Sequence, residues 1–336
     1  MKLKRRDLLG LGISTAALAA CNKFANAPSN KSSGNLVAAN TDASSAKLRL
    51  GFQPPYVAVY ALREQKLLEK AFAGQSTNFE FRRMLSLKPL AEALSAGALD
   101  LGLGGTPIAA IANGQPIRII ALVERSPKTH ALLVLPNSPI KKIADLKGKK
   151  LGNPSGKSYY FAIRVLERAG LKDTDVEWVQ IENDAGRAAL LSGAIDVWGT
   201  WDPFYASAEV AKEVVPLVDG EGYQLNYVAL FGRIDYIEEN PEVVQKFLQA
   251  YKQAITWAKN NRQPAVDILV KQNKLSPEAA DLTLSRRNLI FEPPNNEYRQ
   301  ELIEQSQLLT RLGLIEQQPN WNKAIDITLA QTVAAS

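Results

Sequence analysis

The chain has 336 residues, 22% of them charged, and its 40 Lys and Arg residues outnumber its 34 Asp and Glu residues, giving a formal net charge of +6. Five of these charges (Lys2, Lys4, Arg5, Arg6 and Asp7) lie at the N-terminus, and without them 36 basic (40 less four) and 33 acidic (34 less one) residues remain. So balanced a charge excludes nucleic acid as the expected partner.

The N-terminal segment, residues 1–21, has the pattern of an export signal and not of a folded element. Its basic start precedes a short apolar run from Leu8 to Ala20, which is too short to remain as a membrane-spanning helix. The pair Arg5-Arg6 predicts twin-arginine export, with ordinary secretory export as the alternative. Leu18-Ala19-Ala20-Cys21 is similar to a bacterial lipoprotein box, which implies Cys21 as the lipidated first residue of the mature protein.

Cys21 is the only cysteine of the chain. The mature protein therefore has no disulfide and no thiolate metal site, and we expect neither a metal nor a cofactor. Its stability must come from its core alone, and the chain is long enough for that. Residues 22–45 are rich in Ala, Asn and Ser without an apolar period, so we expect a flexible tether between a lipid anchor and the folded part.

Strands and helices alternate through the first part of the body. Leu48, Leu50 and Phe52 alternate with polar or small residues, as in a strand, and the apolar run at 117–123 predicts a buried strand. In chain order we expect strand 48–52, helix 56–70, strand 78–84, helix 89–96, strand 99–104, helix 107–113 and strand 117–123. This order predicts a mostly parallel sheet with helices on both faces.

A second series of elements begins near residue 131. In chain order we expect strand 131–135, a short helix from 143, a strand ending near 152, helix 159–169, strand 176–181, helix 185–192, strand 195–199, helix 203–212 and strand 227–232. Beyond this strand the sequence predicts only helices. Asn240-Pro241 and Ser276-Pro277 indicate two helix starts, and residues 296–312 form an amphipathic pattern.

One eight-residue pattern occurs twice. Residues 94–101 (LSAGALDL) and 190–197 (LLSGAIDV) each predict a helix end, a Gly turn and a strand. Each strand runs into a Gly/Thr turn that ends in Thr106-Pro107 or Asp202-Pro203, the pattern of an N-cap followed by proline at the first helical position. Two similar α/β units facing each other across a cleft explain the repeat, and chance similarity of two such units is the alternative.

These units suggest two lobes. We expect lobe 1 to comprise residues 46–136 and 226–336 and lobe 2 residues 137–225, with the strands at 131–135 and 227–232 as the two crossings. Strand ends at the crossings would then act as hinges for closure.

Several segments together resemble the substrate-binding proteins of ABC transporters for alkanesulfonates, taurine and nitrate. The segments are residues 48–53, 104–107, 143–150, 196–204 and 308–315, of which 196–204 (DVWGTWDPF) is the most specific. The resemblance covers roughly residues 47–316. It implies an α/β, two-lobed type II periplasmic binding protein fold with two hinge strands, a periplasmic location, a membrane permease as partner and no catalysis.

The candidate ligand-binding residues are those that offer hydrogen bonds to an anion at strand ends and helix starts. Trp201, in the turn, is expected to form an apolar wall for an alkyl chain, whereas Trp198 follows the strand alternation and is expected in the core. Arg125 is placed to pair either an anion or Glu124. The set is Gln53, Gly105, Thr106, Arg125, Ser155, Gly156, Lys157, Ser158, Trp201 and Asp202.

Enzyme functions find little support in the sequence. The single histidine, His130, starts a predicted strand and is expected to be structural, and no nucleophile or phosphate-loop motif is present. The sequence therefore predicts a monomeric solute receptor for a small anion, most of all an aliphatic sulfonate. Nitrate or a thiamine-precursor pyrimidine as the ligand, and a solute sensor for a membrane receptor, remain alternatives.

Overall fold

The computed structural model describes residues 46–84 and 86–335, which form two β-sheets. The predicted export signal, Cys21 and the tether at 22–45 lie outside the described residues. The first sheet contains, side by side, β11 (Leu289–Glu292), β4 (Ile117–Arg125), β10 (Tyr227–Arg233), β3 (Leu101–Gly104), β1 (Ala46–Phe52) and β2 (Thr77–Arg83). The second contains β7 (Glu177–Gln180), β6 (Lys150–Asn153), β8 (Val197–Trp201), β5 (His130–Val134) and β9 (Val215–Asp219).

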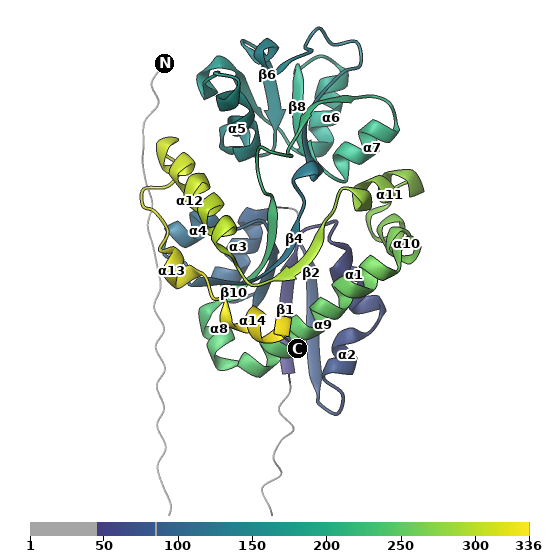
Figure 1. Cartoon of the computed structure of the whole chain (residues 1–336), viewed down its shortest axis with the longest axis vertical. Helices are drawn as coiled ribbons and strands as arrows, with labels where there is room; N and C mark the ends of the chain where they lie inside the picture. The colour runs from purple at the N-terminus through teal and green to yellow at the C-terminus, as the bar shows by residue number, and fades with distance from the viewer. Residues whose placement is uncertain (1–45, 85, 336) are drawn as a thin grey trace, which may run out of the picture. The chain divides into compact units, whose positions relative to one another are not determined.

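Helices cover both faces of each sheet, as predicted (Figure 1). One face of the first sheet packs against α1 (Val57–Glu64), α2 (Leu67–Ala71), α8 (Ile234–Glu239), α9 (Pro241–Asn260), α10 (Arg262–Asn273), α11 (Pro277–Ser285) and α14 (Thr328–Ala335). The other face packs against α3 (Leu87–Ser95), α4 (Ile108–Ala112), α12 (Asn296–Arg311) and α13 (Trp321–Ala324). We call this sheet with its helices the first lobe.

The second lobe is smaller. Its sheet carries α5 (Tyr160–Arg168) on one face, and α6 (Asn183–Leu191) and α7 (Phe204–Val210) on the other. Short 3-10 helices are η1 (Pro127–Thr129), η2 (Ile143–Leu146), η3 (Gly156–Ser158) and η4 (Asp173–Asp175). Side chains alternate between the two cores along each strand, so that Val197 packs toward α5 and Trp198 toward α6 and α7. Trp198 is fully buried, as expected from its place in the strand.

The sheets are mixed, which corrects the prediction of a mostly parallel sheet. β1 is parallel to β2 and β3, but β10 lies antiparallel between β3 and β4. In the second lobe β6 is parallel to β7 and β8, whereas β5 is antiparallel to β8 and β9. The reason is that β5 and β10 each follow a crossing between lobes. Each begins beside the carboxyl end of a neighbouring strand and can only run back along it.

The predicted crossings are therefore corrected as well. β5 belongs wholly to the second sheet and β10 wholly to the first. The chain passes between lobes in the short segments on either side of them, at 126–129 and 220–226, which are held together by hydrogen bonds. Asn226 donates from its side-chain amide to the carbonyl of Ser126 (2.8 Å) and to the hydroxyl of Thr129 (2.9 Å). The two crossings thus lie against each other.

The repeated pattern has the same geometry in both lobes. Gly97 and Gly193 adopt positive φ (67° and 75°), and the turn after each closes with the same backbone hydrogen bonds. The carboxylate of Asp100 accepts the backbone N–H of Arg49 in β1, and that of Asp196 accepts the N–H of Lys150 in β6, both at 2.8 Å. The repeated sequence therefore adopts the same local structure in both lobes.

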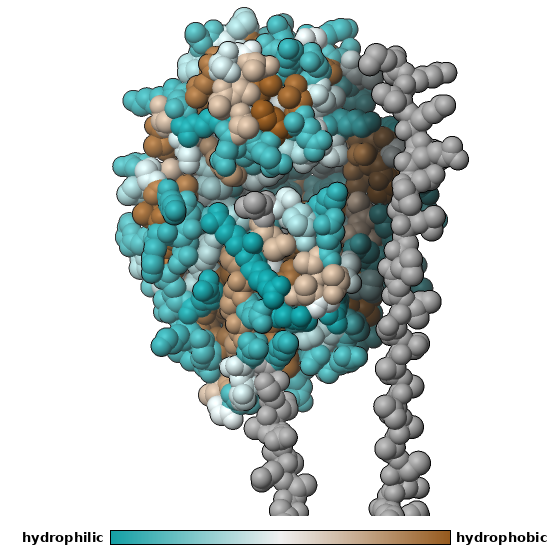
Figure 2. Space-filling model, turned by 180° about the vertical axis from the view of Figure 1, so that it is seen from behind, coloured by the Kyte–Doolittle hydropathy of each residue, from teal (hydrophilic) through white to brown (hydrophobic). Residues whose placement is uncertain are grey.

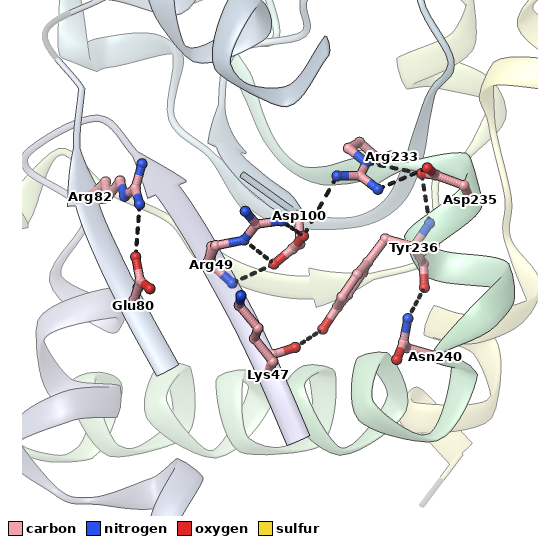
Figure 3. Close-up of polar contacts among 9 residues, drawn as sticks. All are labelled: Lys47, Arg49, Glu80, Arg82, Asp100, Arg233, Asp235, Tyr236 and Asn240. Atoms are coloured by element: carbon pink, nitrogen blue, oxygen red, sulfur yellow. Dashed lines mark hydrogen bonds and ion pairs between the residues drawn. The ribbon is translucent and has the colours of Figure 1, made fainter. Parts of the chain in front are cut away.

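The first-lobe copy is reinforced by two arginines (Figure 3). Asp100, only 2% exposed, accepts from the Arg49 guanidinium at 2.9 and 2.5 Å. Arg233 lies 3.9 Å away and also pairs with Asp235. These contacts stabilise the amino-terminal edge of the sheet, and the opposite, carboxyl edge is left to face the second lobe.

Candidate functional site

A cavity of about 290 Å³ lies between the carboxyl ends of strands from both sheets. The first lobe contributes the segment after β1, the turn after β3, the end of β4 and one side of α12, and the second lobe contributes η3 and the end of β8. Carboxyl strand ends are where open α/β sheets bind ligands. Among the described residues, no three His, Cys, Asp or Glu side chains are grouped so as to hold a metal ion, and no helix has the length and apolar character needed to cross a membrane.

Most of the residues singled out in the sequence come together here. The lining includes Gln53, Gly105, Thr106, Ser155, Ser158, Trp201 and Asp202. The side chain of Gln53 packs against Gly104. A Cβ added at Gly104 would come within 2.6 Å of the Gln53 amide oxygen, so the glycine makes room for the Gln53 side chain. A Cβ at Gly105 would meet nothing within 4 Å, which leaves open space at this turn.

Three of the expected residues do not line the cavity. Lys157 is exposed, and Gly156 is buried with its carbonyl accepting a hydrogen bond from the Asn153 amide at 3.2 Å. Arg125 turns away because neighbouring side chains of a strand point to opposite faces, and it pairs with Glu297 of α12 at 2.9 Å. These positions therefore lie outside the cavity wall.

The helix starts also differ from the prediction. Pro107 and Pro203 are themselves the N-cap residues of α4 and α7, so both helices begin one residue later than expected, and they have only five and seven residues. The Thr106 hydroxyl does not cap α4 but shares a 2.5 Å hydrogen bond with the hydroxyl of Tyr298. Helix dipoles at these two turns are consequently weak, and positive charge for an anion must come from elsewhere.

The cavity wall contains the cation Arg287, which sequence reasoning missed, together with its partner Glu124. Arg287 follows α11 and reaches Glu124 at the end of β4, with Nη1 donating to both carboxylate oxygens at 2.7 and 2.9 Å. Both side chains are nearly inaccessible, at 4% and 3% exposure. The Arg287 guanidinium also lies over the ring of Tyr56. Among the described residues that line the cavity, Arg287 is the only Lys or Arg.

An aromatic group forms the second-lobe wall. Trp201 stacks on His130 with ring centroids 5.6 Å apart, and the Tyr159 hydroxyl lies 3.0 Å from Nδ1 of His130. Burial, with a smaller effect of the Arg287 charge, lowers the pKa of His130 to about 3. The ring is therefore neutral at pH 7 and acts as a packing and hydrogen-bonding group, in keeping with the structural role expected from the sequence.

Asp202 links the lobes beside the crossing. Its carboxylate accepts the backbone N–H of Ala206 in α7 at 2.9 Å and pairs with Arg286 of the first lobe at 3.2 Å. Arg286 also contacts Glu209 and lies over the ring of Tyr205, both in α7. Burial raises the pKa of Asp202 to about 7, although Arg286 acts in the opposite direction.

A second carboxyl group with a raised pKa lines the cavity from α12. Glu301 is 6% exposed and accepts the backbone N–H of Leu225 at 2.5 Å. Burial raises its pKa to about 7. On the outer side of the cavity, Glu304 of the same helix accepts a hydrogen bond from the Tyr160 hydroxyl of the second lobe at 3.1 Å. The two lobes are therefore in contact on both sides of the cavity.

Two α/β lobes with a polar cavity between their strand ends define the architecture of a two-lobed binding protein of the periplasmic type. The family model described as "NMT1/THI5 like" matches residues 89–265. A relative from Escherichia coli (strain K12), named for binding aliphatic sulfonates, is 31% identical over 261 residues, which is 76% of this chain and 81% of its own. The chain therefore belongs to the NMT1/THI5-like family.

Solved structures give the same result for the fold. The periplasmic aliphatic sulphonate binding protein SsuA from Escherichia coli is 27% identical with a TM-score of 0.78, covering 83% of this chain and 92% of that one. The alkanesulfonate-binding protein SsuA from Xanthomonas axonopodis pv. citri, bound to MOPS, is 25% identical with a TM-score of 0.73, covering 86% and 97%. Similarity at this level extends over both lobes.

Proposed function

We propose that this protein is the solute-binding component of an ABC importer and that it captures a small anion, an aliphatic sulfonate, in the cavity between its lobes. The relatives named above bind aliphatic sulfonates or alkanesulfonates. The observation that carries the proposal for this chain is the buried Arg287 at the cavity wall, whose pairing with Glu124 uses Nη1 alone. Binding and not catalysis is the proposed role.

The chemistry of the wall suits a sulfonate head group. A sulfonate has no proton to donate at pH 7 and needs hydrogen-bond donors around its three oxygens. Glu124 engages only Nη1 of Arg287, and within the described part of the chain Nη2 makes no hydrogen bond, so it is free to donate. Gln53 and Thr106 of the first lobe and Ser155 of the second add neutral donors around the cavity, and Gly105 leaves space among them. The Ser158 hydroxyl lines the cavity but donates to the carbonyl of Ser155 at 2.6 Å.

The apolar part of the ligand would face the aromatic group. Trp201 is partly exposed, lines the cavity and is held in place by stacking on His130. We assign it the alkyl-contacting role predicted from the sequence, although it is the last residue of β8 and not part of the turn that follows. Asp202, by contrast, is engaged by Ala206 and Arg286, so we assign it to positioning the second-lobe turn.

Closure of the lobes would retain the ligand. We propose that residues 46–126 and 226–335 move as one body and residues 130–220 as the other, with the crossings as hinges. Because both lobes line the cavity, a ligand contacts both only in the closed form and stabilises it. Hinge closure of this kind is established for periplasmic binding proteins as a class.

The proposal extends to the cell envelope. Residues 1–21 would direct export to the periplasm, Cys21 would carry the lipid anchor, and residues 22–45 would tether a monomeric receptor within reach of its membrane permease. Substitution of Cys21 tests the lipid anchor. Cys21→Ser should release the protein from the membrane fraction into the soluble periplasmic fraction.

Thermal unfolding with a ligand panel tests the proposed function. The panel holds methanesulfonate, ethanesulfonate, hexanesulfonate, taurine, nitrate, bicarbonate and a hydroxymethylpyrimidine. A ligand at 100 times its Kd adds about 2.7 kcal/mol of stability, which raises Tm by roughly 5 °C for a protein of this size. We expect a shift with sulfonates. A shift with the pyrimidine alone, or with no member of the panel, would contradict a small anion as the ligand.

A further inference from the structure

A second hollow opens beside the ligand cavity. We call it the apolar groove; its volume is about 510 Å³, and α3, α4 and α12 of the first lobe and the start of α5 in the second form its walls. Its apolar surface comes from Leu87, Ala91, Ile108, Ala109, Leu308 and Leu309. Its two charged residues, Lys88 and Glu92, are exposed and therefore lie at its rim. Figure 2 shows hydrophobic surface on the side of the molecule where Figure 1 places α4 and α12.

The apolar groove adjoins the cavity. Leu87, Thr106, Ser158, Tyr160 and Gln305 line both hollows and form the boundary between them. A molecule that reaches from the cavity into the groove must pass these side chains. The combined space far exceeds what a one- or two-carbon sulfonate occupies.

The two hollows differ in chemistry. The cavity contains the Arg287–Glu124 pair and the neutral hydrogen-bond donors described above. The groove presents mainly hydrocarbon, and hydrocarbon surface between two lobes gains stability when an apolar group displaces its water. A polar end joined to an apolar end matches the shape of an amphiphile.

We propose that the apolar groove holds the far end of the ligand's hydrocarbon tail, beyond the first carbons that face Trp201, while the anionic head group lies beside Arg287. This inference rests on the proposed function and narrows it to sulfonates whose chain is long enough to pass Thr106 and Tyr160. Both lobes contribute to the groove, so the tail also stabilises the closed arrangement.

Titration calorimetry with linear alkanesulfonates from methane- to decanesulfonate, below their micelle concentrations, tests the inference. Once the chain reaches the groove, each further methylene should tighten binding about fourfold. Ala109→Glu places a carboxylate on an exposed groove position and should abolish this gain, with unchanged affinity for methanesulfonate. Ala96→Glu, the same substitution at an exposed alanine outside the groove, is the matched control and should behave as the unmodified protein.

The outcomes separate the two claims. Binding of short sulfonates without any gain at greater length, or an equal gain in Ala109→Glu, overturns the groove assignment and leaves the proposed function standing. Failure of every sulfonate to bind overturns both. Leu309→Gln, a milder change on α12, should reduce the gain per methylene and provides a second variant if Ala109→Glu folds poorly.

Discussion

The Arg287–Glu124 pair allows stability and ligand binding to be separated by substitution. Both side chains are almost fully buried, and removing one partner leaves the other as an uncompensated charge in the core. We expect Arg287→Met or Glu124→Leu alone to lower the free energy of unfolding by about 3–5 kcal/mol. That is a large part of the 5–15 kcal/mol typical of a folded protein.

The double variant Arg287→Met/Glu124→Leu is expected to recover most of this loss, because an apolar pair of similar volume needs no counter-charge. Its binding of sulfonate should nevertheless stay lost, since the cavity no longer contains a cation. Urea unfolding followed by tryptophan fluorescence gives the stabilities of all four proteins, and calorimetry gives the affinities. The role assigned to Arg287 would be refuted by either of two results. One is a loss of unfolding free energy below 1 kcal/mol in each single variant, with the two losses simply adding in the double variant. The other is sulfonate binding by the double variant.

Three further predictions follow from the site. Trp201→Ala should weaken binding of an alkanesulfonate about tenfold and that of nitrate much less, and equal losses in calorimetry would remove Trp201 from the alkyl-contacting role. Because burial raises the pKa of Glu301 from 4.5 to about 7, the folded state binds its proton more tightly, and stability falls as pH rises between these values. Glu301→Gln should therefore reduce that fall by up to about 1.4 kcal/mol per pH unit in urea unfolding, and an unchanged profile would contradict the raised pKa. Arg286→Met removes the cation beside Asp202, so the variant should lose more stability at pH 8 than at pH 6; equal losses would show that the Asp202 carboxyl does not ionise there.

Much of the fold could be predicted from local patterns. The strands with a clear apolar pattern, such as β1 with its alternation and β4 with its continuous run, lie close to their expected positions, and the repeated helix-turn-strand pattern recurs in three dimensions. The two strands that the sequence did not indicate, β9 and β11, are both edge strands. Both strands are short and partly exposed, and β9 contains Pro216, so their brief apolar runs did not stand out as strands in the sequence.

The predicted helix at 56–70 shows another limit of local reasoning. The structure divides it into α1 and α2 at Lys66, which adopts a left-handed conformation with φ of 51°. Lysine is a good helix former, and nothing in the apolar spacing marks the break. The sequence pattern did not reveal that these two short helices pack against α9.

The candidate site was predictable where it depends on strand ends and not where it depends on distant partners. Gln53 and Thr106 follow neighbouring strands of the first sheet and Trp201 ends a strand of the second, so strand topology brings each to a carboxyl edge. Arg287 and Glu124 are 163 positions apart, and their pairing is a result of tertiary structure. The signal that was available is the pair Arg286-Arg287 directly after a helix, in a region interpreted as helical throughout.

The placement of the cation on one lobe has a kinetic consequence. Arg287 and Glu124 both belong to the first lobe, whereas Ser155, Ser158 and Trp201 belong to the second. We therefore expect a ligand to bind first to the donors of the larger lobe, after which the smaller lobe closes over it. Because Arg287 is buried and paired with Glu124, its substitution should mainly shorten the lifetime of the complex, as should substitutions at Ser158 or Trp201, while the association rate changes little.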